Sequence, residues 1–241
     1  MEIDFNKLID NYFSREFKSK KIGRYYPSEI GGCLRKTWFS YKFPKETDKE
    51  VIKIMEAGNI IHEFIVEVLK SDKNDDIELL ETELPFTIDE GDFTISGRID
   101  NIILTKINNK KVLIEVKSTK FLPKEANEHH ISQLQLYMHA VGIHEGIILY
   151  LQKDNLQTAS FNIKYDDEKS HEIIKRFHGL HYALKENKTP PAEAKIIKNK
   201  NWMCNYCEYK EECDKLPLEE TSFKEDSIKS STDLYIKTSL M

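Results

Sequence analysis

Four cysteines constrain the fold more than any other feature of the sequence, because three lie near one end of the chain and the fourth lies near the other. Cys204, Cys207 and Cys213 follow the pattern C-x2-C-x5-C, and Cys33 precedes them by 171 positions. Three thiolates leave a four-ligand site incomplete, and the sequence has no fifth cysteine. Cys33 is therefore the candidate for the fourth ligand of either a zinc ion or an iron–sulfur cluster, and the alternative is four free structural cysteines. Such a site would bring the N-terminal helices against the C-terminal segment.

The N-terminus favours a reducing compartment for these thiols. The first ten residues, MEIDFNKLID, carry acidic side chains and no apolar stretch, so we expect no signal peptide. No apolar run approaches the roughly 18 residues that a membrane span needs. We expect a cytoplasmic protein without a membrane partner, in which a disulfide framework is not expected.

Length and charge favour one domain with an elaboration and leave the partner open. The chain has 241 residues, 39% of them hydrophobic, which is enough for a sizeable core. Its net charge is −5, but residues 1–45 carry an excess of five positive charges and the remainder carries ten net negative charges. The basic N-terminal part is either an ordinary solvated surface or the footprint of a polyanion. Charge alone does not decide between them.

Hydrophobic spacing and turn residues predict a mixed α/β (α+β) domain. Helices are expected at 3–20, in a short stretch after Ser28, in a long stretch opened by the capping box Thr47-Asp48-Lys49-Glu50, and at 124–142 and 166–187. Strands are expected at 78–88, 92–105, 111–118, 145–151 and 157–164. We expect N-terminal helices in 1–45, a core in 46–190, a cysteine segment in 191–216 and a mobile polar tail in 217–241.

The strongest catalytic signal lies on the hairpin formed by the strands at 92–105 and 111–118. A two-residue turn at Asn108-Asn109 would place Asp100 opposite Lys117, with Glu115 diagonally across on the same face. Two carboxylates can hold a divalent cation through oxygen, and that cation can polarise a phosphodiester and activate a water. A lysine can stabilise the charge that develops. The alternative is an ordinary surface hairpin with a salt bridge.

The wider pattern of motifs resembles the RecB-like branch of the PD-(D/E)XK nucleases. That branch carries a helical histidine, then G-x-h-D, E-x-K and Q-h-x-x-Y, where h is apolar. The matching residues here, in order, are His62, Gly97-Arg98-Ile99-Asp100, Glu115-Val116-Lys117 and Gln133-Leu134-Gln135-Leu136-Tyr137. The resemblance therefore implies a RecB-like nuclease core.

The resemblance also implies a role for each of these residues. His62, Asp100, Glu115 and the main-chain carbonyl of Val116 would bind Mg²⁺ or Mn²⁺. Asp100, Glu115, Lys117, Gln133 and Tyr137 would form the catalytic set. Gln133 and Tyr137 lie one helical turn apart and would position Lys117, a water or a substrate phosphate.

The cysteine pattern narrows the resemblance within that branch. A lone N-terminal cysteine followed by C-x2-C-x5-C resembles the iron–sulfur nucleases, such as the AddB nuclease domain and the CRISPR-associated Cas4-type exonucleases. The chain's length favours the Cas4-type family. This implies a [4Fe–4S] cluster on Cys33, Cys204, Cys207 and Cys213. Leu34 stands where that family commonly has a proline after the first cysteine.

The function implied by the resemblance is a metal-dependent DNA exonuclease. It would act on single-stranded DNA ends and process DNA for CRISPR spacer acquisition, beside the spacer-integration complex. One alternative is a repair or viral recombination nuclease with the same chemistry. The other is a non-catalytic iron–sulfur scaffold that binds DNA, although retention of all six motif residues argues against it.

Overall fold

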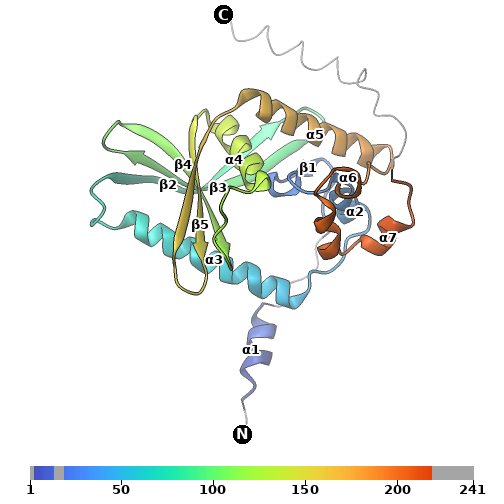
Figure 1. The fold of residues 1–241 in the computed structure, drawn as a ribbon, viewed down its shortest axis with the longest axis horizontal. Coiled ribbons are helices and arrows are strands. Elements are labelled where there is room, and N and C mark those ends of the chain that lie inside the picture. The colour runs from blue at the N-terminus through green and yellow to red at the C-terminus, as the bar shows by residue number, and fades with distance from the viewer. Residues whose placement is uncertain (1–2, 14–18, 219–241) are drawn as a thin grey trace, which may run out of the picture.

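A six-stranded mixed sheet forms the centre of the computed structural model, which describes residues 3–13 and 19–218 (Figure 1). The sheet order is β1-β3-β4-β5-β6, with β2 paired to β3. The β4–β5 and β1–β3 pairs are parallel, and the other pairs are antiparallel. The strands are β1 Arg24–Tyr25, β2 Ile77–Asp89, β3 Thr94–Thr105, β4 Lys110–Thr119, β5 Glu145–Gln152 and β6 Thr158–Lys164.

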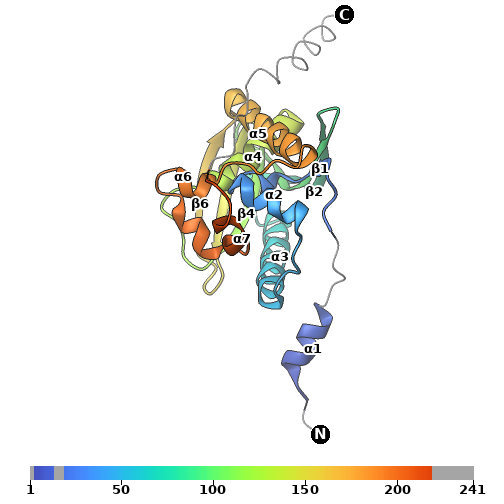
Figure 2. The same cartoon turned by 90° about the vertical axis from the view of Figure 1, so that its right-hand side faces the viewer.

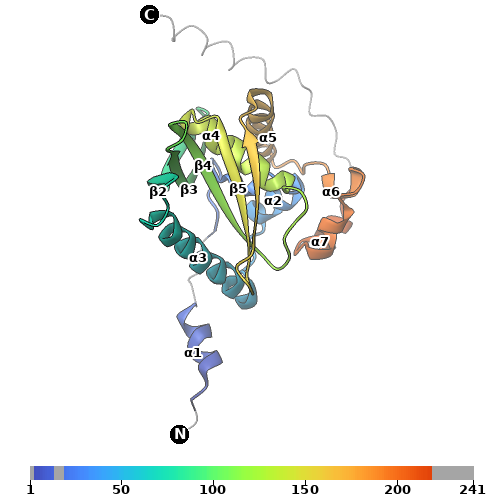
Figure 3. The same cartoon turned by 60° about the vertical axis from the view of Figure 1, so that its left-hand side comes forward.

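Helices cover both faces of this sheet. On one side lies α3 (Lys49–Lys70), whose Ile61 and Ile65 pack on apolar residues of β3, β4 and β5. On the other side lies α4 (Glu128–Val141), whose Leu134 and Met138 share a core with those same strands (Figure 3). The sheet is therefore the middle of three layers, and the fold is mixed α/β as predicted.

Helices α2, α6 and α7, which come from the N-terminal and C-terminal parts of the chain, lie side by side at one side of the molecule (Figure 2). There α2 contacts α5, and both belong to one apolar core that also holds Tyr209. These elements are α2 Leu34–Lys42, α5 Asp167–Lys185, α6 Glu193–Ile196 and α7 Lys210–Asp214, with 3-10 turns at Pro27–Glu29 and Asn201–Tyr206. Among the described helices, none has both the length and the apolar character needed to cross a membrane.

The predicted elements agree closely with the observed ones in the middle of the chain and less well at the ends. Each predicted strand overlaps its observed counterpart, and the long helix begins as expected after Asp48, whose side chain accepts a hydrogen bond from the Glu50 amide. The first helix, α1 (Phe5–Tyr12), is shorter than the predicted 3–20. Residues 14–18 and most of the expected tail lie outside the described residues. The two-residue strand β1 was not predicted.

The predicted hairpin register is wrong by two residues. Thr105 pairs with Lys110, so the turn spans residues 106–109 rather than Asn108-Asn109 alone. The Thr105 hydroxyl donates to the Asn108 side chain, and Asn109 adopts a φ of 54°, which together close the wider turn. Extending the ladder from Asn101 opposite Ile114 brings Asp100 level with Glu115 instead of Lys117. A shift of two leaves the predicted face unchanged.

One edge of β3 is open next to this hairpin. β2 pairs with β3 from Thr94 to Thr105, whereas β4 pairs only from Asn101 onward and β1 only at Thr94 and Ile95. Since β2 takes one edge, β1 and β4 share the other and leave residues 96–100 between them. Gly97 is needed in this stretch, because a Cβ there would lie 2.8 Å from the Phe86 ring. Asp100 therefore stands where β4 has diverged from β3.

Candidate active site and cysteine cavity

Two carboxylates meet at the open edge of β3. Asp100 Oδ2 accepts a hydrogen bond of 2.8 Å from the Val116 amide, so a side chain takes the place of the missing ladder bond. Glu115 is fully buried, and its Oε1 lies 2.5 Å from Lys117 Nζ. Its Oε2 accepts no hydrogen bond from any residue that the structure describes. Burial raises the pKa of both carboxyls, and the Asp100 charge raises that of Glu115 further.

Lys117 connects this pair to α4. Its Nζ donates to Gln133 Oε1 at 3.2 Å, and Gln133 Nε2 in turn donates to the Tyr137 hydroxyl at 2.5 Å. Gln133 and Tyr137 share one buried face of the helix, as their spacing predicted. Burial alone would lower the pKa of Lys117, but the Glu115 carboxylate outweighs it and raises the pKa above its usual value. Lys117 is therefore positively charged, and its contacts with Glu115 and Gln133 fix the position of its ammonium group.

His62 reaches the same place from the opposite layer. It projects from α3, and its Nδ1 lies 3.6 Å from Asp100 Oδ2. Burial lowers the pKa of this imidazole, which also contacts the main chain of Val116. A neutral imidazole is the form that binds a metal. The structure thus brings together all the residues predicted for the catalytic and metal-binding sets.

Sequence reasoning missed two neighbours of the site. Glu83 of β2 offers a carboxylate oxygen that, together with ligand atoms of His62 and Asp100, forms a group within 4.8 Å. Tyr150 pairs with Lys117 in the β4–β5 register, and its hydroxyl contacts His130 Nδ1 at 2.7 Å. No motif marked either one. Only the register of β2 and β5 against the predicted hairpin would have found them.

The donor set at this edge suits a hard divalent cation. It combines carboxylate oxygens with one neutral imidazole, a set that accommodates Mg²⁺ and suits Mn²⁺. The buried oxygen Oε2 of Glu115 supplies the test of fit, because an unpaired buried carboxylate oxygen is costly unless a cation compensates it. Lys117 then provides a positive charge beside the ion.

The four cysteines line one cavity of about 620 Å³ between the two ends of the chain. Burial and neighbouring thiols raise the pKa of Cys204 and Cys207. In the described part of the chain, no three of the cysteine sulfurs lie within 4.8 Å of one another. Cys33 therefore shares a cavity with Cys204, Cys207 and Cys213.

An ion pair and several hydrogen bonds hold α2 and the C-terminal cysteine segment together around this cavity. The Glu193 carboxylate accepts from the Leu34 amide at 2.9 Å and from both terminal nitrogens of Arg176. Arg35 is 1% exposed and donates to the Pro190 and Leu218 carbonyls. These contacts fix the first turn of α2 to the segment that carries the other three cysteines.

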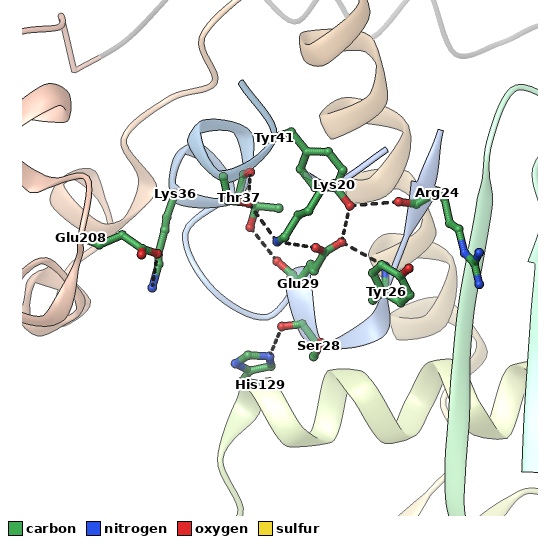
Figure 4. A network of polar contacts seen from close by, with 11 residues as sticks. Lys20, Arg24, Tyr26, Ser28, Glu29, Lys36, Thr37, Tyr41, His129 and Glu208 are labelled. Atoms are coloured by element: carbon green, nitrogen blue, oxygen red, sulfur yellow. Dashed lines mark hydrogen bonds and ion pairs between the residues drawn. The ribbon is translucent and has the colours of Figure 1, made fainter. Parts of the chain in front are cut away.

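The loop before Cys33 also rests on the helix of the active site (Figure 4). Glu29 anchors the loop by accepting from the Tyr41 hydroxyl at 2.7 Å and from Lys20 at 2.7 Å. The ring of His129, in the first turn of α4, hydrogen-bonds the Ser28 carbonyl at 2.9 Å. A Cβ at Gly31 would lie 2.2 Å from the His129 ring. Helix α4 therefore links the two regions, because its His129 contacts the loop beside the cysteine cavity and its Gln133 and Tyr137 belong to the candidate active site.

Comparison with known proteins gives three findings. The family model of the PD-(D/E)XK nuclease superfamily matches residues 23–214. The CRISPR-associated exonuclease Cas4 of Saccharolobus solfataricus is 25% identical over 167 residues, which are 69% of this chain and 80% of that protein. The crystal structure of SSO0001 superposes with a TM-score of 0.58 at 23% identity, covering 90% of this chain and 95% of that one.

Proposed function

The chain belongs to the PD-(D/E)XK nuclease superfamily and is a metal-dependent nuclease, and we propose that it is a DNA exonuclease that acts on single-stranded ends and carries a [4Fe–4S] cluster. One observation carries the catalytic part of the proposal. Asp100, Glu115 and Lys117 converge at the open edge of β3, and Glu115 keeps a buried oxygen without a hydrogen-bond donor among the described residues. That arrangement is organised for a cation and a phosphodiester.

Each residue of the site has a task in this proposal. His62, Asp100, Glu115 and the Val116 carbonyl would hold Mg²⁺ or Mn²⁺, which when bound polarises the phosphodiester and lowers the pKa of a water. Lys117 stabilises negative charge on the phosphate, or orients the water, from the direction fixed by Glu115 and Gln133. Tyr137 holds the Gln133 amide in turn.

We propose the substrate from the similarity to the exonuclease of Saccharolobus solfataricus. That protein is described as a CRISPR-associated exonuclease, so we assign to this chain the trimming of DNA captured for CRISPR spacer acquisition, in the cytoplasm and beside the spacer-integration complex. A repair role would use the same chemistry on the same ends. The genes that flank this one distinguish the two, because only the first role needs neighbouring CRISPR genes.

The proposed cluster would bind in the cavity of the four cysteines, because Cys33, Cys204, Cys207 and Cys213 all line one space of about 620 Å³. In this proposal residues 1–45 carry the first cluster cysteine, residues 46–190 form the nuclease core and residues 191–216 complete the cluster. The cluster would be structural.

Anaerobically purified protein should contain iron and sulfide, and stoichiometric zinc without iron would contradict the assignment of a [4Fe–4S] cluster.

The test of the activity is cleavage of end-labelled single-stranded DNA with Mg²⁺, Mn²⁺ or EDTA. We expect Asp100→Ala and Lys117→Ala to lower the rate at least about 1000-fold, equivalent to about 4 kcal/mol of transition-state stabilisation. DNA binding should persist in both variants, because phosphate contacts by Lys and Arg do not need the metal. Lys117→Ala should also keep its metal, since an ammonium group is not a ligand.

His62→Ala should need more metal, and excess Mn²⁺ should partly restore its activity. Full activity of Asp100→Ala, or of the wild type in EDTA, would refute the site. If cluster-loaded wild type binds DNA tightly but never cuts it, the protein is a scaffold.

A further inference from the structure

Glu83 has a backbone conformation that is unusual within a strand. It lies in β2 between Thr82, paired with Asn101, and Leu84, paired with Ile99, so it stands beside Asp100 of β3. Its φ is 51°, in the left-handed region, which non-glycine residues rarely adopt. Surrounding structure must hold such a residue in place, and here its carboxylate lies within 4.8 Å of ligand atoms of His62 and Asp100.

The Glu83 carboxylate joins His62 and Asp100 in one compact group. One ligand atom from each of the three lies within 4.8 Å of the other two. The three side chains come from different elements: His62 from α3, Glu83 from β2 and Asp100 from β3. An imidazole and two carboxylates so arranged are a donor set for a divalent cation.

A second observation points independently to a cation at this place. Glu115 is fully buried beside Asp100, and its Oε2 has no hydrogen-bond donor among the described residues. With Glu83 the site has three carboxylates, whereas Lys117 is the ammonium that lies within ion-pair distance of Glu115. The excess of negative charge favours a bound cation.

The protein offers Glu83 only a weak partner of its own. Arg98 Nη1 lies 3.3 Å from its Oε2, and both side chains are more than half exposed. Ion pairs at such exposed positions contribute little to stability. A divalent cation can therefore replace Arg98 as the partner of this carboxylate.

We propose that Glu83 is a further metal ligand, which binds the divalent cation of the site together with His62 and Asp100. This rests on the proposed metal-dependent chemistry and adds a residue to it that no motif includes. Arg98 has the opposite effect in the metal-free protein, because it neutralises the carboxylate that the cation needs. Glu83 thereby sets how much metal the site requires.

The test measures Mn²⁺ affinity of the full chain by the electron paramagnetic resonance signal of free Mn²⁺. Glu83→Gln keeps the size of the side chain and should raise the Mn²⁺ dissociation constant at least about tenfold, the range seen when groups around a metal are altered. Glu81→Gln, in the same strand, is the matched control and should bind Mn²⁺ like wild type.

Arg98→Gln separates a metal ligand from a structural ion pair. If Glu83 binds metal, Arg98→Gln leaves Mn²⁺ affinity unchanged or strengthens it. If the pair is only structural, both variants weaken binding alike, and the proposal is wrong. It is equally wrong if Glu83→Gln binds Mn²⁺ like wild type. Wild type that binds Mn²⁺ through Glu83 but cuts no DNA would refute the nuclease assignment and leave this inference intact.

Discussion

The active site and the cysteine cavity differ in what holds their functional side chains in place. Those of the active site project from long elements, namely the 22 residues of α3, the 14 of α4, and the 12 and 10 of β3 and β4. The cavity is lined by residues of short segments, among them the six-residue turn Asn201–Tyr206 and the five-residue α7. Short helices are marginal without tertiary contacts. The elements of the candidate active site are therefore held mainly by their own length and packing, whereas the segments around the cavity depend on contacts such as those of Arg35 and Glu193. In the proposed function the cluster adds to these contacts.

Cysteine variants should show the largest loss of stability, because they alter the region around the cavity. We expect Cys33→Ala and Cys207→Ala each to lose iron and to lower the free energy of unfolding by at least about 5 kcal/mol, since a structural metal contributes about 10–16 kcal/mol of apparent binding free energy in small domains. Iron analysis and denaturant unfolding under anaerobic conditions measure both effects. Glu115→Gln is the counterpart from the other region and should retain iron. Loss of iron from Glu115→Gln, or normal iron in Cys33→Ala, would show that the two regions do not differ as proposed.

Gly31 tests whether the two regions are coupled, because it lies where the loop before Cys33 contacts α4. Gly31→Ala would place a methyl group 2.2 Å from the His129 ring, and the loop and α4 must separate to admit it. Overpacking of this kind costs about 1–3 kcal/mol. We expect a lower unfolding midpoint together with a lower cleavage rate, because the displaced helix also carries Gln133.

Gly32→Ala is the matched control for this substitution. A Cβ at Gly32 meets nothing within 4 Å, so this variant should behave like wild type. If Gly31→Ala matches Gly32→Ala in both measurements, contact through His129 does not couple the regions.

The pH dependence of stability in the metal-free protein tests the candidate active site by itself. Burial raises the pKa of Asp100 to about 6 and that of Glu115 to about 7. At pH values between the ordinary pKa of a carboxyl group and these raised pKa values, the folded state therefore binds more protons than the unfolded chain. The free energy of unfolding should therefore fall as pH rises from about 4 to about 7, by about 1.4 kcal/mol per unit of pKa shift. Urea unfolding in EDTA measures this slope, and Asp100→Asn should make it shallower. A free energy of unfolding that rises with pH over this range would contradict the stated directions of the two pKa shifts.

The sequence predicted well which residues lie together in the candidate site, because periodicity and motif spacing both refer to regular elements. Gln133 and Tyr137 share a helical face whatever the tertiary structure, and strand alternation keeps Asp100 and Glu115 on one face even though the register was wrong by two. The actual turn depended on the Thr105 hydroxyl and on a positive φ at Asn109. Local patterns do not determine such details.

Other features could not be read from local sequence at all. Glu83 belongs to the site only because β2 pairs with β3 in one particular register, and β1 was missed because two residues show no periodicity. Arg35 reads as a basic surface residue, yet it is buried between carbonyls that lie more than 150 positions away. Each of these depends on contacts between distant parts of the chain.

The cavity shared by Cys33 and Cys204 has a consequence for how the protein is made. Ribosomes add about 5–20 residues per second, so the 171 positions between these cysteines correspond to about 9–34 s of synthesis. During that interval the strands and helices of the sheet can already associate, while the Cys33 thiol waits without its three partners. Under the proposed cluster assignment, loading of the cavity is therefore among the last steps in maturation, and Cys33 is the one cysteine of the nascent chain until Cys204 is made.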